Sequence, residues 1–252
     1  MAGREERSIV NRPDSMSNAP MAQFSVLLLT AAPPGLPKVA GGGALLKVDG
    51  REAILKSSEL FLNRENIKQI LVVFAADQVE EAKRKFGGHF GFSGIKLITG
   101  GPRWIDQLAA AAEKISPDAT HVLVHDAARP AVAFSDIDAL LSAAEKATYA
   151  ALTTPLRSTL IETDEGDSPV ALQSPERFAQ LLTPIVYACK TFDELAKTKT
   201  EPHASTLTLV KGLPMNVRLN SPADVPLVSA MLKLLPKPKI KAPDSPFDEA
   251  QW

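Results

Sequence analysis

Residues His121–Pro130, HVLVHDAARP, are the most informative segment of this chain about its fold. It begins with an apolar run of strand length, which is typical of a strand buried on both faces of a sheet. The run leads directly into Asp126 and Arg129, and Pro130 then ends the segment. Because ligands of open α/β sheets bind at the carboxyl ends of the strands, we expect Asp126 and Arg129 to face a ligand there.

Apolar segments of this kind recur along the chain and alternate with segments of helical spacing. Strands are predicted over residues 24–32, 67–76, 94–101 and 120–130, and helices over residues 54–66, 77–88, 103–115 and 134–147. Continuous apolar strands separated by amphipathic helices indicate a parallel sheet that is covered on both faces. With right-handed crossovers, the predicted fold class is α/β, with a doubly wound, mostly parallel Rossmann-like sheet.

The pattern changes after Thr153. Residues 156–174 alternate apolar and polar side chains around an acidic Gly-Asp turn, which predicts a hairpin or a projecting β-arm over about 155–175. Residues 207–235 then resume with a strand, a link, a second strand and a closing helix capped near Ser221. We therefore expect a single domain over 23–235, flanked by disordered tails at 1–22 and 236–252 that are polar or proline-rich.

Composition excludes several classes of function. A formal net charge of -1 over 252 residues gives no basic surface for nucleic acid, and no lysine-rich helix suggests a membrane surface. The apolar run near the start is too short for a membrane helix, and the residues before it do not suit a signal peptide, so a cytoplasmic protein is expected. Cys189 is the only cysteine, which excludes an intramolecular disulfide. A glycine fingerprint for NAD is also missing after the first strand.

The strand end at Asp126 suits phosphate chemistry. A single carboxylate beside a nucleotide is enough to hold magnesium, because this ion takes most of its ligands from water and phosphate oxygens. Arg129 can present a planar fork to a phosphate. A purely structural alternative is equally consistent with the spacing: Asp126 would cap the following turn, and Arg129 would pair with it.

The segment VLVHDAARP is similar to the signature of the cytidylyltransferases that act on 2-C-methyl-D-erythritol 4-phosphate. The segments LLLTAA, ITGG, LLTPIVY and LVKGLPMNVRLNSPADV resemble further parts of that family in the same order, so the resemblance covers roughly residues 24–235. It implies a nucleotidyltransferase-type sheet, binding of CTP with magnesium, transfer of CMP to the sugar phosphate and release of pyrophosphate. It also implies a homodimer in which the arm reaches the neighbouring site.

The resemblance assigns roles to individual residues. Asp126 matches the metal-binding acid, and Arg218 stands where the family has a catalytic lysine. Arg129, Thr159 and Thr183 match residues of the sugar-phosphate region. The expected nucleotide-binding residues are Ala31, Ala32, Gly35, Lys38, Gly100, Gly101 and Arg103.

The first loop departs from the family pattern. Pro33 stands where the family has its first glycine, and Pro37 where it has an arginine. Pro33 and Pro34 have no N–H to offer a phosphate. After the glycine pair Gly100–Gly101, Trp104 and Gln107 replace the family's arginine and serine. Candidates to replace the missing ligands are Lys38, Lys47, Arg103 and the glycine run at 41–43. These losses leave open an alternative, a catalytically weakened homologue that acts as a binding or regulatory subunit.

Overall fold

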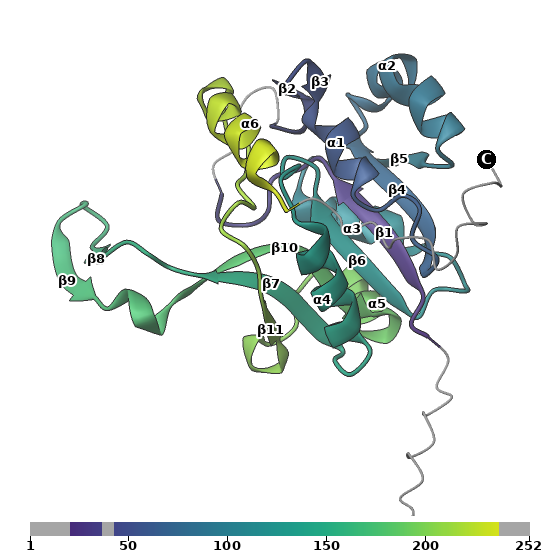
Figure 1. The fold of residues 1–252 in the computed structure, drawn as a ribbon. Helices are drawn as coiled ribbons and strands as arrows, with labels where there is room; N and C mark the ends of the chain where they lie inside the picture. Colours follow the sequence, from purple (N-terminus) through teal and green to yellow (C-terminus); the bar gives the residue numbers. More distant parts are fainter. Residues whose placement is uncertain (1–20, 37–42, 237–252) are drawn as a thin grey trace, which may run out of the picture.

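The computed structural model describes residues 21–36 and 43–236, which form an α/β domain around a seven-stranded sheet (Figure 1). The strand order is β11-β7-β10-β6-β1-β4-β5, and all pairs are parallel except those of β10 with β6 and β7. The strands are β1 (Phe24–Leu29), β4 (Ile67–Ala75), β5 (Lys96–Gly100), β6 (His121–Asp126), β7 (Tyr149–Pro155), β10 (Ala179–Ala188) and β11 (Thr208–Lys211). The mostly parallel sheet predicted from the sequence is confirmed.

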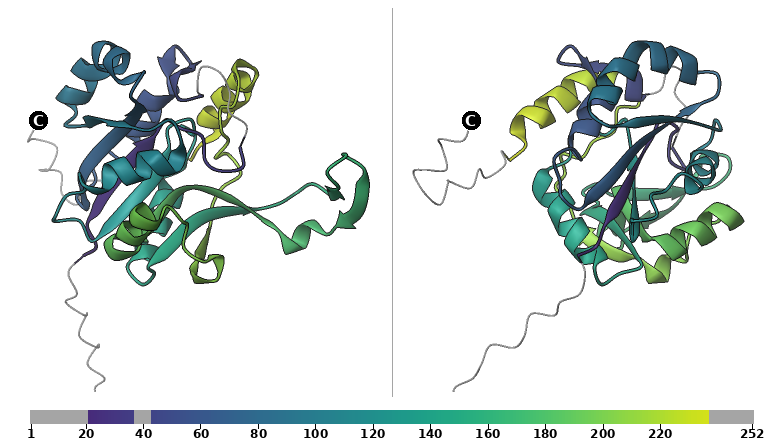
Figure 2. Two further views of the ribbon diagram at one scale, coloured as in Figure 1. Left: turned by 180° about the vertical axis from the view of Figure 1, so that it is seen from behind. Right: turned by 90° about the vertical axis from the view of Figure 1, so that its right-hand side faces the viewer.

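Helices cover both faces of the sheet, as Figure 2 shows from two further sides. One face carries α1 (Ala53–Glu59), α2 (Val79–Phe92) and α4 (Phe134–Ala144), and the other carries α3 (Trp104–Ala112) and α5 (Cys189–Thr198). The last helix, α6 (Val225–Leu234), packs against a small hairpin of β2 (Lys47–Val48) and β3 (Arg51–Glu52). Short 3-10 turns are η1 (Gly43–Leu45), η2 (Pro175–Arg177), η3 (Ala204–Thr206) and η4 (Pro222–Asp224).

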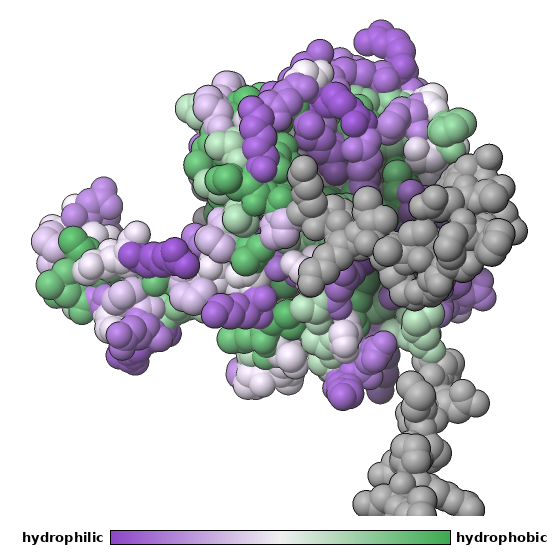
Figure 3. Space-filling view, in the orientation of Figure 1, coloured by the Kyte–Doolittle hydropathy of each residue, from purple (hydrophilic) through white to green (hydrophobic). Residues whose placement is uncertain are grey.

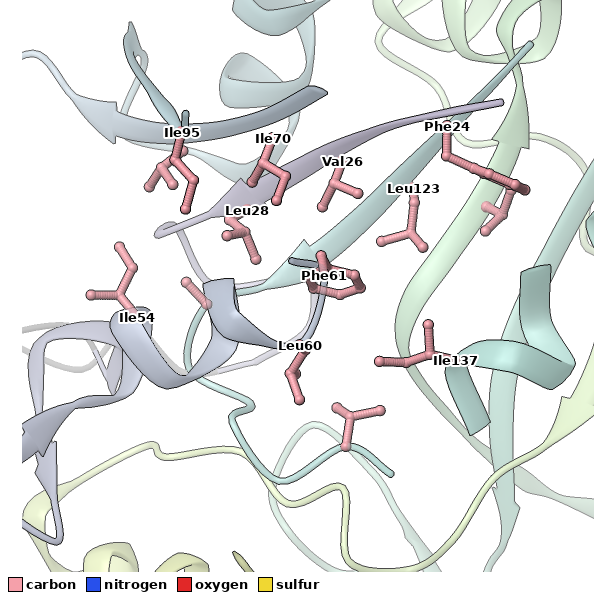
Figure 4. Packing of buried hydrophobic residues seen from close by; sticks show 14 of the residues in the cluster. Phe24, Val26, Leu28, Ile54, Leu60, Phe61, Ile70, Ile95, Leu123 and Ile137 are labelled. Atoms are coloured by element: carbon pink, nitrogen blue, oxygen red, sulfur yellow. The ribbon is translucent and has the colours of Figure 1, made fainter. Parts of the chain in front are cut away.

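The central strand β1 explains why the core has two halves. All six of its residues are buried, and successive side chains of a strand point to opposite faces. Val26 and Leu28 therefore enter one apolar cluster, and Leu27 and Leu29 enter the other. Figure 4 shows the first cluster, in which side chains of β1 and β4 meet Ile54 of α1. Burial on both faces is the reason why this strand is apolar at every position except Ser25, whose buried hydroxyl donates to Oε1 of Gln69.

The predicted arm is present. It consists of β8 (Leu160–Thr163) and β9 (Pro169–Gln173), which pair in antiparallel fashion and project from the domain (Figure 1). Asp164 closes the turn, because its Oδ1 accepts the N–H groups of Gly166 and Ser168, each at 2.9 Å. Asp167 has a φ of 59°, a left-handed conformation that aspartate tolerates in turns.

The prediction of a second strand after Gly212 is wrong. Residues 212–220 contain no strand. They pass the carboxyl end of β6 and continue into η4 and α6. The N–H of Leu219 donates to the carbonyl of Ala128 at 2.9 Å, which ties this crossing segment to the turn after β6. The expected cap at Ser221 is confirmed, because Ser221 and Asp224 form a capping box. Among the described residues, no helix has both the length and the apolar character needed to cross a membrane.

Candidate active site at the end of β6

Asp126 is the last residue of β6, and its side chain is completely buried. One carboxylate oxygen, Oδ2, accepts a hydrogen bond from Nε of Arg218 at 2.6 Å. The other, Oδ1, accepts the N–H of Ala128 at 2.9 Å. Asp126 therefore closes the turn after the strand and forms an ion pair, as the structural alternative predicts, although its closest arginine is Arg218. The expectation that its side chain faces a ligand is wrong for this structure, because packing leaves the carboxylate no exposed surface.

Two arginines surround this carboxylate. Arg218 comes from the crossing segment, and Nε of Arg129 lies 3.7 Å from Oδ2 of Asp126. Nη1 of Arg129 donates to the carbonyl of Asn216 at 2.8 Å, while its buried Nε has no hydrogen-bond partner within the part of the chain that the structure describes. Burial lowers the pKa of Arg129, an effect that Asp126 opposes and Arg218 reinforces. With two guanidinium groups for one carboxylate, this cluster carries an excess positive charge.

His125 connects β6 to β10 through a directional chain of hydrogen bonds. A carbonyl can only accept, so the imidazole Nε2, 3.0 Å from the carbonyl of Arg129, must carry the proton. Its bare Nδ1 then accepts from the hydroxyl of Thr183 at 3.1 Å, and that hydroxyl accepts the N–H of Asp126 at 3.1 Å. Burial lowers the pKa of His125 to about 3, so the ring is neutral near neutral pH.

The structure thus brings together four of the predicted residues: Asp126, Arg129, Thr183 and Arg218. Sequence reasoning missed two others that join them. His125 was part of the quoted motif but received no role, although a polar ring one residue before Asp126 was a usable signal. Asn216 bridges two segments, because its Nδ2 donates to the carbonyl of Thr183 at 2.6 Å while its own carbonyl accepts from Arg129. Nothing in the sequence marks Asn216 beyond its place in the matched segment.

The first loop follows β1 at the same edge of the sheet. Ala31 and Ala32 are partly buried, whereas Gly35 is exposed and has a φ of 78°, which suits glycine in the turn closed by Pro33 and Leu36. Oε1 of the buried Gln107 accepts the N–H groups of Thr30 and Ala31, each at 3.1 Å. A side chain of the protein therefore occupies the N–H of Ala31, one of the predicted nucleotide-binding residues, together with that of Thr30. From the sequence, Gln107 was known only as a replacement for the family's serine, and this role was not predicted.

The glycine pair Gly100–Gly101 lies at the end of β5. A Cβ on Gly100 would approach the Val73 side chain to 2.7 Å, and one on Gly101 would approach Cβ of Asp106 to 2.5 Å. Close packing against β4 and α3 is therefore sufficient to explain both glycines. Arg103 does not turn toward Asp126; its guanidinium donates to both carboxylate oxygens of Asp106, at 2.6 and 2.8 Å.

Thr159 and Lys47 are not part of the cluster around Asp126. Thr159 is exposed and directly precedes β8 on the arm, which Figure 1 shows away from the sheet. Lys38 lies outside the described residues, as do positions 41 and 42 of the glycine run. Gly43, the last of that run, is in contact with the crossing segment, where a Cβ would come within 1.7 Å of the Leu219 carbonyl oxygen. Lys47 is largely exposed, 4.0 Å from Glu52 within its own hairpin.

The arrangement around Asp126 does not fit a magnesium ion. Both carboxylate oxygens are engaged by protein donors, and the side chain has no exposed surface. No group of three or more His, Cys, Asp or Glu side chains among residues 21–36 and 43–236 could hold a metal ion. Magnesium binding, which the resemblance implies, stays a prediction.

Comparison with known proteins decides the family. The sequence model of IspD, 2-C-methyl-D-erythritol 4-phosphate cytidylyltransferase, matches residues 27–233. The chain belongs to the IspD family. A relative named bifunctional enzyme IspD/IspF, from Solidesulfovibrio magneticus, is 28% identical over 226 residues, which cover 81% of this chain and 56% of that longer protein. A 2-C-methyl-D-erythritol 4-phosphate cytidylyltransferase from Frankia casuarinae is 27% identical, covering 76% of each chain.

Solved structures of the IspD family share the fold. The enzyme of that name from Thermus thermophilus matches with a TM-score of 0.65 and 23% identity, covering 84% of this chain and 99% of its own. The 4-diphosphocytidyl-2C-methyl-D-erythritol synthase from Anaerococcus prevotii matches with a TM-score of 0.68 and 15% identity, covering 84% and 96%. The family expected from the HVLVHDAARP segment is confirmed, and the comparisons do not favour the alternative of a catalytically weakened homologue that acts as a binding or regulatory subunit.

Proposed function

We propose that this chain transfers CMP from CTP to 2-C-methyl-D-erythritol 4-phosphate, in the cytoplasm, with release of pyrophosphate. The observation that carries the proposal is the meeting of Asp126, Arg129, Thr183 and Arg218, which three separate segments bring to the end of β6. These residues match the family's site, and their two cations for one carboxylate suit a phosphorylated ligand.

The chemistry requires positioning and charge neutralisation. An oxygen of the sugar phosphate attacks the α-phosphorus of CTP in line, a new P–O bond forms, and the bond to the leaving pyrophosphate breaks. We assign the phosphates to Arg129 because it is the second cation beside a single carboxylate, and its Nε, 3.7 Å from Oδ2 of Asp126, forms no hydrogen bond with the described residues. Thr183 and His125 hold the strand end beneath it through their hydrogen bonds to Asp126 and Arg129.

Pyrophosphate release from CTP and 2-C-methyl-D-erythritol 4-phosphate, assayed with magnesium present, tests this proposal. Turnover should require both substrates, and Arg129→Lys should lower kcat/KM by at least about tenfold, because an ammonium cannot reproduce the fork of a guanidinium. Arg64→Lys is the matched control, since Arg64 forms an ion pair with Asp138 before β4, at the opposite end of the sheet. Absence of turnover, together with no thermal shift from any nucleoside triphosphate, would contradict the proposal.

We also propose that the arm forms a homodimer. Its apolar side chains are exposed, and Ile161 (59%) and Leu172 (75%) lie directly opposite each other in the hairpin. Figure 3 shows apolar surface on the projecting arm. A second copy of the chain would cover these side chains, and contiguous exposed apolar surface is typical of such interfaces. In that arrangement Thr159 would serve the neighbouring site, as the family resemblance implies.

Leu172→Glu should convert the dimer to a monomer, because two copies of the arm would then bury a carboxylate without a partner. Light scattering coupled to size exclusion measures the mass directly. Glu165→Gln, at the exposed hairpin turn, should leave the mass unchanged. A wild-type protein that is monomeric at assay concentration would refute the proposed dimer.

A further inference from the structure

The guanidinium of Arg218 is fixed beside the Asp126 carboxylate by several hydrogen bonds. Its Nε donates to Oδ2 of Asp126 at 2.6 Å, while its Nη1 donates to the carbonyl of Leu219 at 3.3 Å and to Oδ1 of Asn220 at 2.8 Å. Arg218 is only 6% exposed, and Asp126 is not exposed at all. The guanidinium is therefore bonded on two sides.

Asn220, which accepts a hydrogen bond from Arg218, is itself held by Asp224. The N–H of Asn220 donates to Oδ2 of Asp224 at 2.7 Å, and Ser221 and Asp224 form the capping box at the start of η4. The guanidinium is thus connected to the segment that begins α6. Moving Arg218 away from Asp126 would require this local network to break, or the side chain to adopt another rotamer.

A divalent cation and Arg218 would compete for the same oxygen atom. Magnesium binds carboxylate oxygens at about 2.0–2.1 Å in near-octahedral geometry, which leaves no room for Nε at hydrogen-bond distance from the same lone pair. Each carboxylate oxygen has a second lone pair, but the side chain has no exposed surface, and Oδ2 is flanked by Nε of Arg218 at 2.6 Å and Nε of Arg129 at 3.7 Å. A lysine at position 218, as in the family pattern, carries all its donors on one nitrogen, so it lacks the separate Nε and Nη1 with which Arg218 joins Asp126 to Leu219 and Asn220.

We propose that Arg218 is an internal cation that takes the place of a divalent ion at Asp126, so that the nucleotide-free protein has no divalent-cation site there. The carboxylate receives its neutralising charge from the chain itself. A divalent ion reaches Asp126 only after Arg218 has moved. This property follows from the arginine at position 218 and distinguishes this chain from one with lysine there.

Binding of Mn²⁺ alone, followed by the loss of the free-ion signal in electron paramagnetic resonance, tests the proposal. The wild-type protein should show no saturable binding that depends on Asp126. Arg218→Lys, which keeps a positive charge beside Asp126, should bind Mn²⁺ at least about tenfold more tightly than the wild type, a difference of about 1.4 kcal/mol. The double variant Asp126→Asn, Arg218→Lys should lose this gain, which would locate the new site at Asp126.

Two further variants sharpen the result. Arg64→Lys, in an ion pair at the opposite end of the sheet, should bind no more Mn²⁺ than the wild type. Asn220→Ala removes one anchor of Arg218 without touching either charge, so it should strengthen Mn²⁺ binding even if Arg218→Lys does not fold. The proposal fails if wild-type protein binds Mn²⁺ in a way that Asp126→Asn abolishes. It also fails if folded Arg218→Lys binds no more tightly than the wild type. No nucleotide is present, so the outcome is independent of whether the chain turns over CTP.

Discussion

Asp126→Ala should lower the free energy of unfolding by about 3–5 kcal/mol, the usual cost of removing one partner from a buried ion pair. The loss would leave Arg218 and Arg129 as two buried cations without an anion between them. It would also remove the acceptor for the N–H of Ala128 in the turn after β6. Urea denaturation followed by circular dichroism measures the change.

The matched comparison is Asp138→Ala, which removes the partner of Arg64. That carboxylate is 64% exposed, so water replaces the lost contact and the change should stay within about 1 kcal/mol. If Asp126→Ala proved as mild as Asp138→Ala, the two arginines would have access to water, and the buried cluster described here would be wrong.

His125 should make the protein sensitive to acid. The folded-state pKa is about 3, below the ordinary value of 6.5, because burial disfavours the charged ring. The unfolded chain therefore binds a proton between these two values that the folded chain does not, and stability falls as pH decreases through this range. From about 1.36 kcal/mol per pH unit, His125 alone should cost about 2 kcal/mol between pH 7 and pH 5.

Urea denaturation of the wild type and of His125→Gln at several pH values isolates this contribution. The variant loses some stability at every pH, but its stability should depend less steeply on pH, since glutamine does not titrate. His203→Gln, at an exposed position, is the control for loss of a histidine and should keep the wild-type slope. Equal slopes for the wild type and His125→Gln would show that His125 is protonated in the folded protein or exposed to water.

The strands of the parallel sheet were predictable because burial on both faces leaves a continuous apolar run. The arm was predictable from its alternating pattern and its acidic turn. The strand predicted after Gly212 was wrong because an extended segment need not join a sheet. The edge beside β7 is already taken by β11, and residues 212–220 cross the strand ends instead.

Some contacts of the site could be predicted from local spacing, and others could not. Arg103 and Asp106 are three residues apart at the start of a helix, a spacing that allows the ion pair the structure contains and that could have been considered from sequence. Gln107 is different, because its role depends on how α3 packs beside β1. The same holds for Asn216, whose two partners come from other segments.

By itself, the sequence determined the sheet, the arm and the position of Asp126 and Arg129 at the end of a strand, because periodicity and local turn chemistry act over a few residues. Only the tertiary structure decided what these side chains contact. Arg218 lies 92 residues along the chain from Asp126, and Thr183 lies 57 residues away. Such contacts form through the crossing of distant segments, so whether a carboxylate faces a ligand or an arginine is settled by packing rather than by spacing.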